Sequence, residues 1–561
     1  MPYAAPLPEF RFLLDHVVGF GRVAATPLFA EASPDTVEAI LVEAGRLCGQ
    51  VLAPLQRAGD KHPARLENGV VRTSPGFADG YRAIVDGGWV GISADPEFGG
   101  MGLPITLATC VNDMMASACL SLQINPLMTQ GQIEALEHHA SDAIKAVYLP
   151  RLISGEWCGT MNLTEPQAGS DVGSLRTKAE PNGDGTYAVT GQKIYISWAD
   201  NDFTANVCHL VLARLPDAVA GPKGISLFMV PKIIPDAEGR LGARNSLKVV
   251  SLEHKLGLHG SPTAVMQYDG ATGWLVGEPH KGLAAMFTMM NNARLGVGVQ
   301  GVGVAEAATQ GALAYALHRR QGRTPLGDGA IFDHADVRRM LGVMRAETFA
   351  ARAIALSCAV AIDMSRATGT AGWSARAALL TPIAKAYGTD VGCDVAQIGI
   401  QVHGGMGFIE DTGAAQYARD VRVTAIYEGT NGIQAMDLVG RKMMDGGAAA
   451  FALLDEVAQA VGPADLVADV RAAGAALRAA TEGLVAQEMN DRFAGAVPYL
   501  RAFARVLGAQ FHLMAAAVDP AREPLARVYI KRLLPEHAAL LAQVREGAAG
   551  LYALDALALS A

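Results

Sequence analysis

The sequence predicts a mainly α-helical protein with a β-domain at its centre. From about Pro34 to Arg151, and again after Lys281, apolar residues recur at three- and four-residue spacing, which is typical of packed helices. Between these regions lie short runs rich in β-branched and aromatic residues, separated by turn clusters, which favour a small sandwich or barrel-like β-domain. A chain of 561 residues is too long for one core, so we expect several domains.

The helical start signal Ser33-Pro34-Asp35 opens the first long helical region. The change to strands falls near Glu156, helices return at Lys281, and further helices follow Asp445. We therefore divide the chain into an N-terminal extension (1–35), an N-terminal helical domain (36–155), a middle β-domain (156–280), a C-terminal helical bundle (281–445) and an extra helical domain (446–561).

Composition excludes several classes of function. Only 18% of the residues are charged and the net charge is −9, so we expect neither nucleic acid nor a membrane as a partner. The sequence has no apolar run long enough for a transmembrane helix and opens without a signal-peptide pattern, which favours a cytoplasmic location. Seven cysteines without a C-x-x-C pair indicate reduced thiols, and the pair His138-His139 lacks metal-ligand spacing, so we expect no metal.

One glycine motif is better explained by packing than by ligand binding. "GVGVQG", Gly296 to Gly301, fits the dinucleotide pattern G-x-G-x-x-G. That pattern requires a preceding strand and an acid about 20 residues later, whereas the preceding run here is helical and Arg319 and Arg320 stand near the expected acid. We interpret the glycines as a surface on which two helices approach closely.

Two segments near the start of the β-domain carry candidate binding residues. Thr164, Glu165, Ser170 and Asp171 surround a Pro- and Gly-containing loop, which is either an ordinary polar turn or a set of hydroxyl and N–H groups offered to a ring edge or phosphate. In "GQKIYIS", Tyr195 and Ser197 would share one strand face. An aromatic beside a hydroxyl suits a flat heterocycle, although such pairs are common.

Glu428 is the candidate catalytic acid. It follows the mostly apolar run 423–426 and precedes a Gly-Thr-Asn-Gly turn in "AIYEGTNGIQ". By itself this window favours a solvated turn residue, because carboxylates are mostly exposed. The alternative is a general base kept partly dry, so that its pKa rises toward neutral.

Six motifs in sequence order resemble those of the acyl-CoA dehydrogenase family and span about Leu103 to Arg441. They are "NLTEPQAGSD", "GQKIYIS", "KLGLHGSPTAVMQYDG", "GEPHKGLAAMF", "QVHGGMGFIED" and "RDVRVTAIYEGTNGIQ". The resemblance implies an N-terminal helical domain, a middle β-domain and a C-terminal four-helix bundle, with FAD at their junction and between subunits. It implies FAD-dependent α,β-dehydrogenation of an acyl-CoA to the trans-2-enoyl-CoA.

The same resemblance assigns roles to individual residues. Glu428 matches the base that takes the α-proton, while a hydride passes from Cβ to flavin N5. The implied substrate contacts are Ser170, Arg294 and Gly429. The implied FAD contacts are Met161, Leu163, Thr164, Ser170, Tyr195, Ser197, Arg319, Gln401, His403, Gly404, Gly405 and Thr430, with Arg319 reaching the FAD pyrophosphate of a partner subunit. Two departures stand out: Gly432 offers FAD no side chain, and "RRQGR" lacks the aromatic-glycine that often follows this arginine.

The two extensions resemble a long bacterial branch of the family that includes 3-(methylthio)propionyl-CoA dehydrogenase. This implies 3-(methylthio)propanoyl-CoA as the substrate, an electron-transferring flavoprotein as the electron acceptor, and a homo-oligomer, with a dimer favoured over a tetramer. A general short- or medium-chain dehydrogenase, an acyl-CoA oxidase and a non-catalytic flavoprotein scaffold stay open. The apolar N-terminal residues Tyr3, Phe10, Phe12, Leu13 and Leu14 predict that the first segment packs, over the CoA-side surface or a subunit interface.

Overall fold

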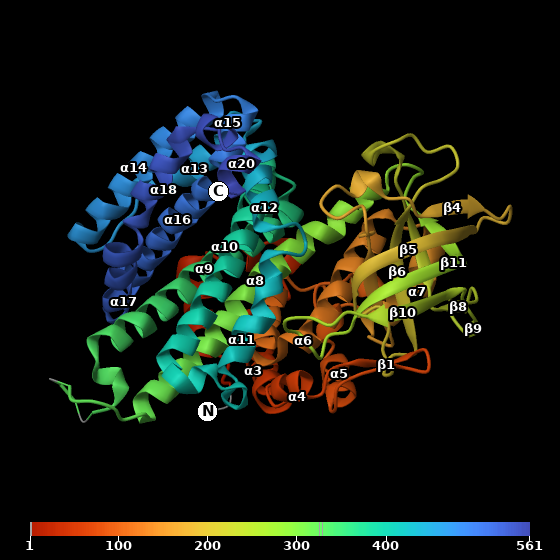
Figure 1. Ribbon diagram of the computed structural model, residues 1–561, viewed down its shortest axis with the longest axis horizontal. Helices are drawn as coiled ribbons and strands as arrows, with labels where there is room; N and C mark the ends of the chain where they lie inside the picture. The colour runs from red at the N-terminus through yellow and green to blue at the C-terminus, as the bar shows by residue number, and fades with distance from the viewer. Residues whose placement is uncertain (1–2, 325, 328, 561) are drawn as a thin grey trace.

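A computed structural model describes residues 3–324, 326–327 and 329–560 (Figure 1). A helical bundle occupies the centre, the β-domain lies on one side of it, and the C-terminal helices, coloured blue in Figure 1, lie on the other. The order helical, β, helical and helical extension confirms the predicted architecture.

The first 155 residues are mostly helical. Their helices are α1 (Leu7–Phe12), α2 (Gly21–Ala24), α3 (Pro34–Leu47), α4 (Leu55–Lys61), α5 (Phe77–Asp86), α6 (Ile105–His139) and α7 (Asp142–Ile153). Helix α3 begins at the predicted signal, where Ser33 Oγ accepts a hydrogen bond from the backbone N–H of Thr36 at 3.2 Å. A hairpin of β1 (Arg65–Glu67) and β2 (Val70–Arg72) was not predicted; it turns at Asn68 and Gly69, whose φ angles are both positive.

Helix α6 doubles back on itself. Cys119 has non-helical angles, φ −156° and ψ 88°, in the middle of its span. Asn112 Nδ2 donates to Gln130 Oε1 at 3.0 Å, although 18 residues of straight helix would extend ~27 Å. We call residues 105–118 the first arm of α6 and residues 120–139 its second arm.

Two helices, α6 and α9 (Ala335–Thr368), are long and apolar enough to cross a bilayer by length and composition alone. Their most apolar windows are 100% and 89% buried inside the protein. Such burial is typical of core helices, and the reversal within α6 also interrupts its length.

The middle domain is a seven-stranded, bent sheet. Its strands are β3 (Trp157–Asn162), β4 (Lys178–Pro181), β5 (Tyr187–Ser197), β6 (Asn206–Ala213), β7 (Ser226–Pro231), β10 (Leu247–Leu252) and β11 (Thr263–Val276). The order is β3-β6-β7-β11-β5-β4, with β10 on β11 and only β3 and β6 parallel among these described pairs. A separate pair is formed by β8 (Ile233–Pro235) and β9 (Leu241–Arg244). The strands surround an apolar core that includes Val189, Val211, Phe228 and Tyr268.

The central bundle consists of α8 (Gly282–His318), α9 and α10 (Ala371–His403), with the shorter α11 (Ala414–Val421) and α12 (Asn431–Val439). A Cβ atom at Gly298 would lie 2.5 Å from the carbonyl oxygen of Ala384, and one at Gly301 would lie 2.2 Å from that of Gly388. "GVGVQG" is therefore a helix contact in the middle of α8, as predicted, and not a dinucleotide loop.

The C-terminal extension covers one side of the bundle (Figure 1). Its helices are α13 (Ala448–Ala458), α14 (Ala464–Ala486), α15 (Met489–Ala494), α16 (Ala496–Val518), α17 (Glu523–Val528), α18 (Glu536–Glu546), α19 (Ala549–Tyr552) and α20 (Ala556–Ser560). Helix α16 packs on α9, α10 and α12. Buried Arg505 donates to Glu347 on α9, to the Tyr387 hydroxyl on α10 at 2.9 Å, and to Glu536 at 2.6 Å.

The N-terminal segment fills the seam between bundle and extension. Phe10 and Leu13 are fully buried, and the Arg522 guanidinium lies 3.6 Å from the centre of the Phe12 ring. Glu9, only 5% exposed, pairs with Arg345 and Arg352 on α9. The apolar side chains of this segment are buried against the segment's own chain, which confirms the prediction that it packs.

The described cysteines are all free and are buried or half-buried, as expected of reduced thiols. His138 lies exposed at the end of α6, and the described residues contain no group of three or more potential metal ligands from His, Cys, Asp and Glu.

Candidate active site

Glu428 lies in a tight turn between a short helical stretch (Arg422–Ala425) and the start of α12. Its φ is +56°, a left-handed conformation that is uncommon for a residue with a side chain and often marks functional sites. Gly429 follows with φ +81°, and Thr430 caps α12 by accepting from the N–H of Ile433 at 3.3 Å. The turn therefore fixes the position of Glu428 just before the N-terminus of α12.

The electrostatic surroundings favour the general-base interpretation of Glu428 over the solvated turn. Burial raises the pKa of its carboxyl group to about 7, while the cations Arg294 and Lys385 lower it. A carboxyl group with this pKa exchanges a proton near neutral pH, which is the property required of a base that removes a weakly acidic C–H proton.

Lys385 is a site residue that the sequence reasoning missed. Its Nζ donates to the carbonyl oxygen of Gly429 and to Asn431 Oδ1, both at 2.9 Å, and its side chain is fully buried. Burial lowers the pKa of Lys385 to about 8. The available signal was a single charged residue in the otherwise apolar run "LLTPIAKAYG" of α10.

Arg294, on α8, is also placed beside Glu428. It is 5% exposed, and its Nη1 lies 3.5 Å from Asp437 Oδ2. Its buried Nε has no hydrogen-bond partner among the described residues. Because a buried unpaired donor is costly, this atom is suited to a polar group of a ligand.

Five predicted flavin contacts gather at one edge of the β-domain. The N–H of Ile194 donates to the carbonyl oxygen of Thr164 at 2.9 Å, and Lys193 Nζ donates to that of Leu163 at 3.1 Å. These bonds hold the loop after β3, with Met161, Leu163 and Thr164, against the end of β5. Tyr195 and Ser197 lie at this end of β5, and both side chains are less buried than that of Ile196 between them.

Tyr195 departs from a regular strand. Its φ is +61°, and the register of β5 against β11 shifts between Lys193 and Ile196. The ring is 61% exposed, so the bulge leaves an aromatic face free at the domain edge. The alternation of residues alone did not predict this bulge.

The second arm of α6 connects this edge to Glu428. Trp198 Nε1, directly after β5, donates to the carbonyl oxygen of Ser121 at 3.1 Å. Two residues later, Gln123 accepts from Gln300 on α8, and Gln300 accepts from the Tyr427 hydroxyl. The structure therefore brings the Tyr195 edge, Arg294 and the Glu428 turn together around one helical arm.

The other predicted FAD contacts form a second, distant cluster. Along α10, 16 residues separate Lys385 from Gln401, or ~24 Å, and along α8, 25 residues separate Arg294 from Arg319, or ~37 Å. His403, Gly404 and Gly405 lie beside Gln401 at the end of α10. One chain does not bring the two clusters together. Ser170 joins neither of them in the described contacts; it is exposed in the loop before the Val172–Ser174 turn.

The second cluster has the space and chemistry for one end of a dinucleotide. A cavity of about 510 Å³ is lined by Tyr315, His318 and His403, among others. A Cβ atom added at Gly404 or Gly405 would meet nothing within 4 Å, and Arg319 is exposed nearby. Open backbone beside an arginine suits an anionic phosphate group.

The fold, the half-buried acid Glu428 and the two clusters define a flavin-dependent acyl-CoA dehydrogenase. Family models match as follows: acyl-CoA dehydrogenase N-terminal domain at 38–156, middle domain at 160–271, C-terminal domain at 280–444, and an acetyl-CoA dehydrogenase C-terminal-like domain at 450–555. The chain belongs to the acyl-CoA dehydrogenase family, an FAD-dependent class of oxidoreductases.

Among its relatives is the 3-methylmercaptopropionyl-CoA dehydrogenase of Ruegeria pomeroyi, which is 45% identical over 89% of this chain and 88% of its own. Two solved structures share the fold. ACDH-11 of Caenorhabditis elegans, in complex with C11-CoA, has a TM-score of 0.78 at 21% identity and covers 95% of this chain and 92% of its own. An acyl-CoA dehydrogenase of Bacillus anthracis, complexed with FAD, has a TM-score of 0.74 at 22% identity and covers 95% and 91%.

Proposed function

We propose that this acyl-CoA dehydrogenase converts 3-(methylthio)propanoyl-CoA to its trans-2-enoyl-CoA product, with Glu428 as the catalytic base. The observation that carries the proposal is the Glu428 carboxyl group, whose pKa burial raises to about 7 beside two cations. The relative from Ruegeria pomeroyi, named for a methylthio-substituted propionyl-CoA, supports this choice of acyl group.

Different residues of the chain would remove the proton, stabilise the thioester carbonyl and set the pKa of the base. Glu428 takes the α-proton of the thioester, and the backbone N–H of the same residue donates to the thioester carbonyl, whose oxygen gains negative charge as the proton leaves. Arg294 and Lys385 keep the pKa of Glu428 from rising further, so that part of the carboxyl group is ionised at neutral pH. FAD, when bound, accepts the two electrons that leave the substrate with the β-hydrogen.

Two copies of the chain would hold the cofactor. Met161, Leu163, Thr164, Tyr195 and Ser197 would contact the flavin ring, with Thr430 next to them. The cluster of Arg319 and 401–405 would contact the dinucleotide end of the FAD in the partner subunit, because it lies far from the first cluster within one chain. This arrangement would require at least two copies of the chain, and we favour a homodimer over a tetramer. An electron-transferring flavoprotein in the cytoplasm would reoxidise the cofactor.

The base assignment is tested with Glu428→Gln, which keeps the shape of the side chain and removes its basicity. We expect the variant to purify with its yellow FAD and to bind acyl-CoA. Anaerobic addition of 3-(methylthio)propanoyl-CoA bleaches the flavin of the wild-type protein but leaves that of the variant unchanged. Bleaching of the variant at the wild-type rate would show that another group takes the proton.

An oxygen electrode separates the dehydrogenase from an oxidase of the same fold. With acyl-CoA as the sole reductant, we expect hydrogen peroxide to form much more slowly than a dye or an electron-transferring flavoprotein is reduced. Equal rates would assign oxygen as the acceptor and overturn this part of the proposal.

A further inference from the structure

The buried ammonium group of Lys385 contacts only neutral acceptors among the residues that the structure describes. Its Nζ donates to the carbonyl oxygen of Gly429 and to Asn431 Oδ1, both at 2.9 Å. The side chain is fully buried. A buried charge is costly unless another charge compensates it, so the carboxylates that act on Lys385 from a short distance decide whether it stays charged.

Two carboxylates act on Lys385, and one of them takes part in the reaction. Burial lowers the pKa of Lys385 to about 8. The other groups that act on it are Glu428 in the turn and Asp390 and Cys393 on α10, which raise this pKa, and Arg294 on α8, which lowers it. Glu428 becomes neutral when it takes the α-proton. During that part of the reaction Asp390 is the carboxylate that remains.

The side-chain amide of Asn431, the first residue of α12, connects Asp390 to Lys385. Its Oδ1 accepts from Lys385, and its Nδ2 donates to Asp390 Oδ1 at 2.6 Å. The same Nδ2 also donates to Thr389 Oγ1 at 3.0 Å and to the carbonyl oxygen of Ala386 at 3.2 Å. The amide oxygen thus faces the cation and the NH₂ group faces the carboxylate, an orientation that favours the charged form of both groups.

The other cation beside Glu428 has a similar arrangement. Arg294 Nη1 lies 3.5 Å from Asp437 Oδ2, so this cation also keeps a carboxylate when the catalytic base becomes neutral. Each of the two cations is therefore supplied with a carboxylate other than the base, by direct contact for Arg294 and through an amide for Lys385.

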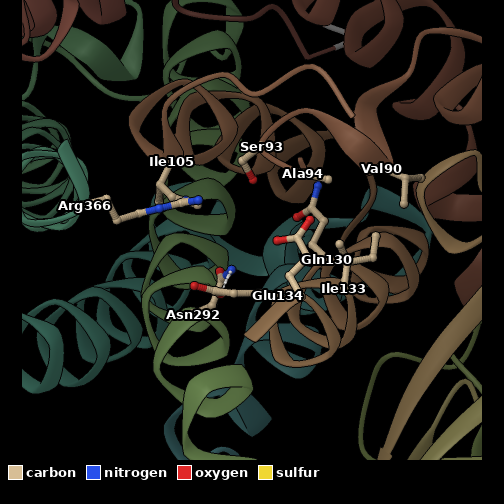
Figure 2. Close-up of a pocket in the computed structure, with 10 residues that line it drawn as sticks. Val90, Ser93, Ala94, Ile105, Gln130, Ile133, Glu134, Asn292 and Arg366 are labelled. Atoms are coloured by element: carbon tan, nitrogen blue, oxygen red, sulfur yellow. Dashed lines mark hydrogen bonds between the residues drawn. The ribbon is translucent and has the colours of Figure 1, made fainter. Parts of the chain in front are cut away.

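A further carboxylate close to α8 belongs to a different part of the protein. Figure 2 shows Glu134 of α6 and Asn292 of α8 facing one another between the two helices. Asn292 Nδ2 donates to Glu134 Oε2 at 2.7 Å. Residues two positions apart on a helix do not face the same side, so Glu134 is held away from the side of α8 that carries Arg294.

The surroundings of Asp390 include the C-terminal extension. Burial raises the pKa of the Asp390 carboxyl group. The hydrogen bond from Asn431 and the charges of Arg501 on α16 and of Lys385 lower this pKa, whereas Asp394, one turn further along α10, raises it. Since Arg501 belongs to the extension, this part of the chain also stabilises the ionised form of Asp390.

We propose that Asp390 and Asn431 are positioning residues that keep Lys385 charged next to the catalytic base throughout the reaction. The inference rests on the proposed function, in which Glu428 takes the α-proton. A protonated Glu428 no longer stabilises the Lys385 cation, and Asp390 still does. A lysine that stays charged favours the return of Glu428 to its ionised form, because the positive charge stabilises the carboxylate.

The test is the pH profile of kcat/KM for Asp390→Asn, measured on the FAD-loaded protein with 3-(methylthio)propanoyl-CoA and a dye acceptor. Asparagine keeps the shape of the side chain and removes its charge. Loss of this carboxylate should lower the pKa of Lys385 by about 1 unit, so that about half of the lysine is neutral at pH 7. We expect the midpoint of the profile to rise by roughly half the shift that Lys385→Met causes, with kcat/KM about 2-fold lower at pH 7 and unchanged near pH 9.

A double variant shows whether the effect passes through the lysine. When Lys385→Met has already removed the cation, adding Asp390→Asn should leave the midpoint where Lys385→Met alone places it. Asn431→Ala removes the bridging amide but neither charge, and it should move the midpoint in the same direction as Asp390→Asn. It carries the test if Asp390→Asn does not fold.

Asp394→Asn is the matched control. Asp394 lies on the same helix and its Oδ2 is 3.7 Å from Arg501 Nη1, but Asn431 donates to Asp390 instead. Removal of the Asp394 charge should leave the midpoint at the wild-type value.

The outcomes are separable. A uniform loss of rate with an unchanged midpoint, in Asp390→Asn or in Asn431→Ala, assigns that residue a structural role only and overturns the inference for it. A midpoint that moves to lower pH shows that Asp390 acts on Glu428 directly as a like charge, and shifts that add in the double variant show that its effect does not pass through Lys385; either result overturns the inference. Bleaching of the flavin in Glu428→Gln at the wild-type rate overturns the proposed function instead.

Discussion

Replacement of Lys385 by methionine should move the pH dependence of the reaction upward. Methionine keeps the length and packing of the side chain but removes the positive charge whose Nζ donates to the carbonyl oxygen of Gly429, the neighbour of Glu428. Lys385 and Arg294 are the two cations that lower the pKa of Glu428 against the effect of burial. Loss of one of them leaves the ionised carboxylate less stable.

The size of the effect follows from the pKa of about 7. An opposite charge within about 4–6 Å lowers a carboxyl pKa by roughly 1–3 units, so its removal should raise the pKa of Glu428 by about 1 unit, or about 1.4 kcal/mol. Since the base acts deprotonated, kcat/KM rises with pH through this pKa. At pH 7 about half of the wild-type carboxyl is ionised and about a tenth in the variant, a roughly 5-fold loss that disappears near pH 9.

The assay is the pH profile of kcat/KM between pH 6 and 9.5 for the wild-type protein and Lys385→Met, with flavin absorbance as a check on cofactor content. Lys281→Met, which removes an exposed lysine paired with Glu278, should keep the wild-type midpoint. A uniform loss of rate at every pH, or a midpoint that moves to lower pH, would refute the electrostatic reasoning and assign Lys385 only to the support of the Gly429 turn.

Three further changes test the second cluster and the seam between the bundle and the extension. Arg319→Ala should lower the amount of FAD that the protein retains after gel filtration. The free energy of unfolding of the apoprotein should change by less than about 0.5 kcal/mol, because the Arg319 side chain is exposed. Full retention of FAD would contradict the proposed role of Arg319. Glu9→Ala removes one of three carboxylates that pair with Arg345 and Arg352, and because Asp113 and Glu306 stay paired with Arg352 it should cost only about 1–3 kcal/mol in denaturant unfolding. Arg505→Met, which leaves the buried Glu347 without its ion pair, should cost more, about 3–5 kcal/mol; unchanged unfolding midpoints would show that these ion pairs contribute little.

Local pattern was sufficient to predict the architecture. The Ser33 start of α3, the strands after Glu156 and the glycine contact surface of α8 all follow from periodicity and residue type. The β1–β2 hairpin was not predicted, even though Asn68-Gly69 is a strong turn signal. The hairpin is short and lies between helices α4 and α5, so the whole region was assigned as helical.

The site was only partly predictable, since its geometry depends on contacts distant in sequence. Glu428 was predicted from its motif, but the pKa of its carboxyl group depends on Arg294 and Lys385, which lie on two other helices. Likewise, Asn112 and Gln130 meet only because α6 reverses at Cys119, and no periodicity within one apolar run marks such a reversal. The bulge at Tyr195 depends on the register against β11, which is also a non-local property.

The position of α16 restricts how copies of this chain assemble. A homodimer with two-fold symmetry uses the same patch on both subunits, and that patch must be free in each. Here α16 already covers part of α9 and α10 within the same chain, so this face is closed to a second copy. The surface after the end of α10 is uncovered within the chain. There Met406, Phe408 and Ile409 are 49%, 86% and 47% exposed, next to Gly404 and Gly405. Symmetric closure through that end would bury these apolar side chains and, in the same step, bring each subunit's second cluster to its partner.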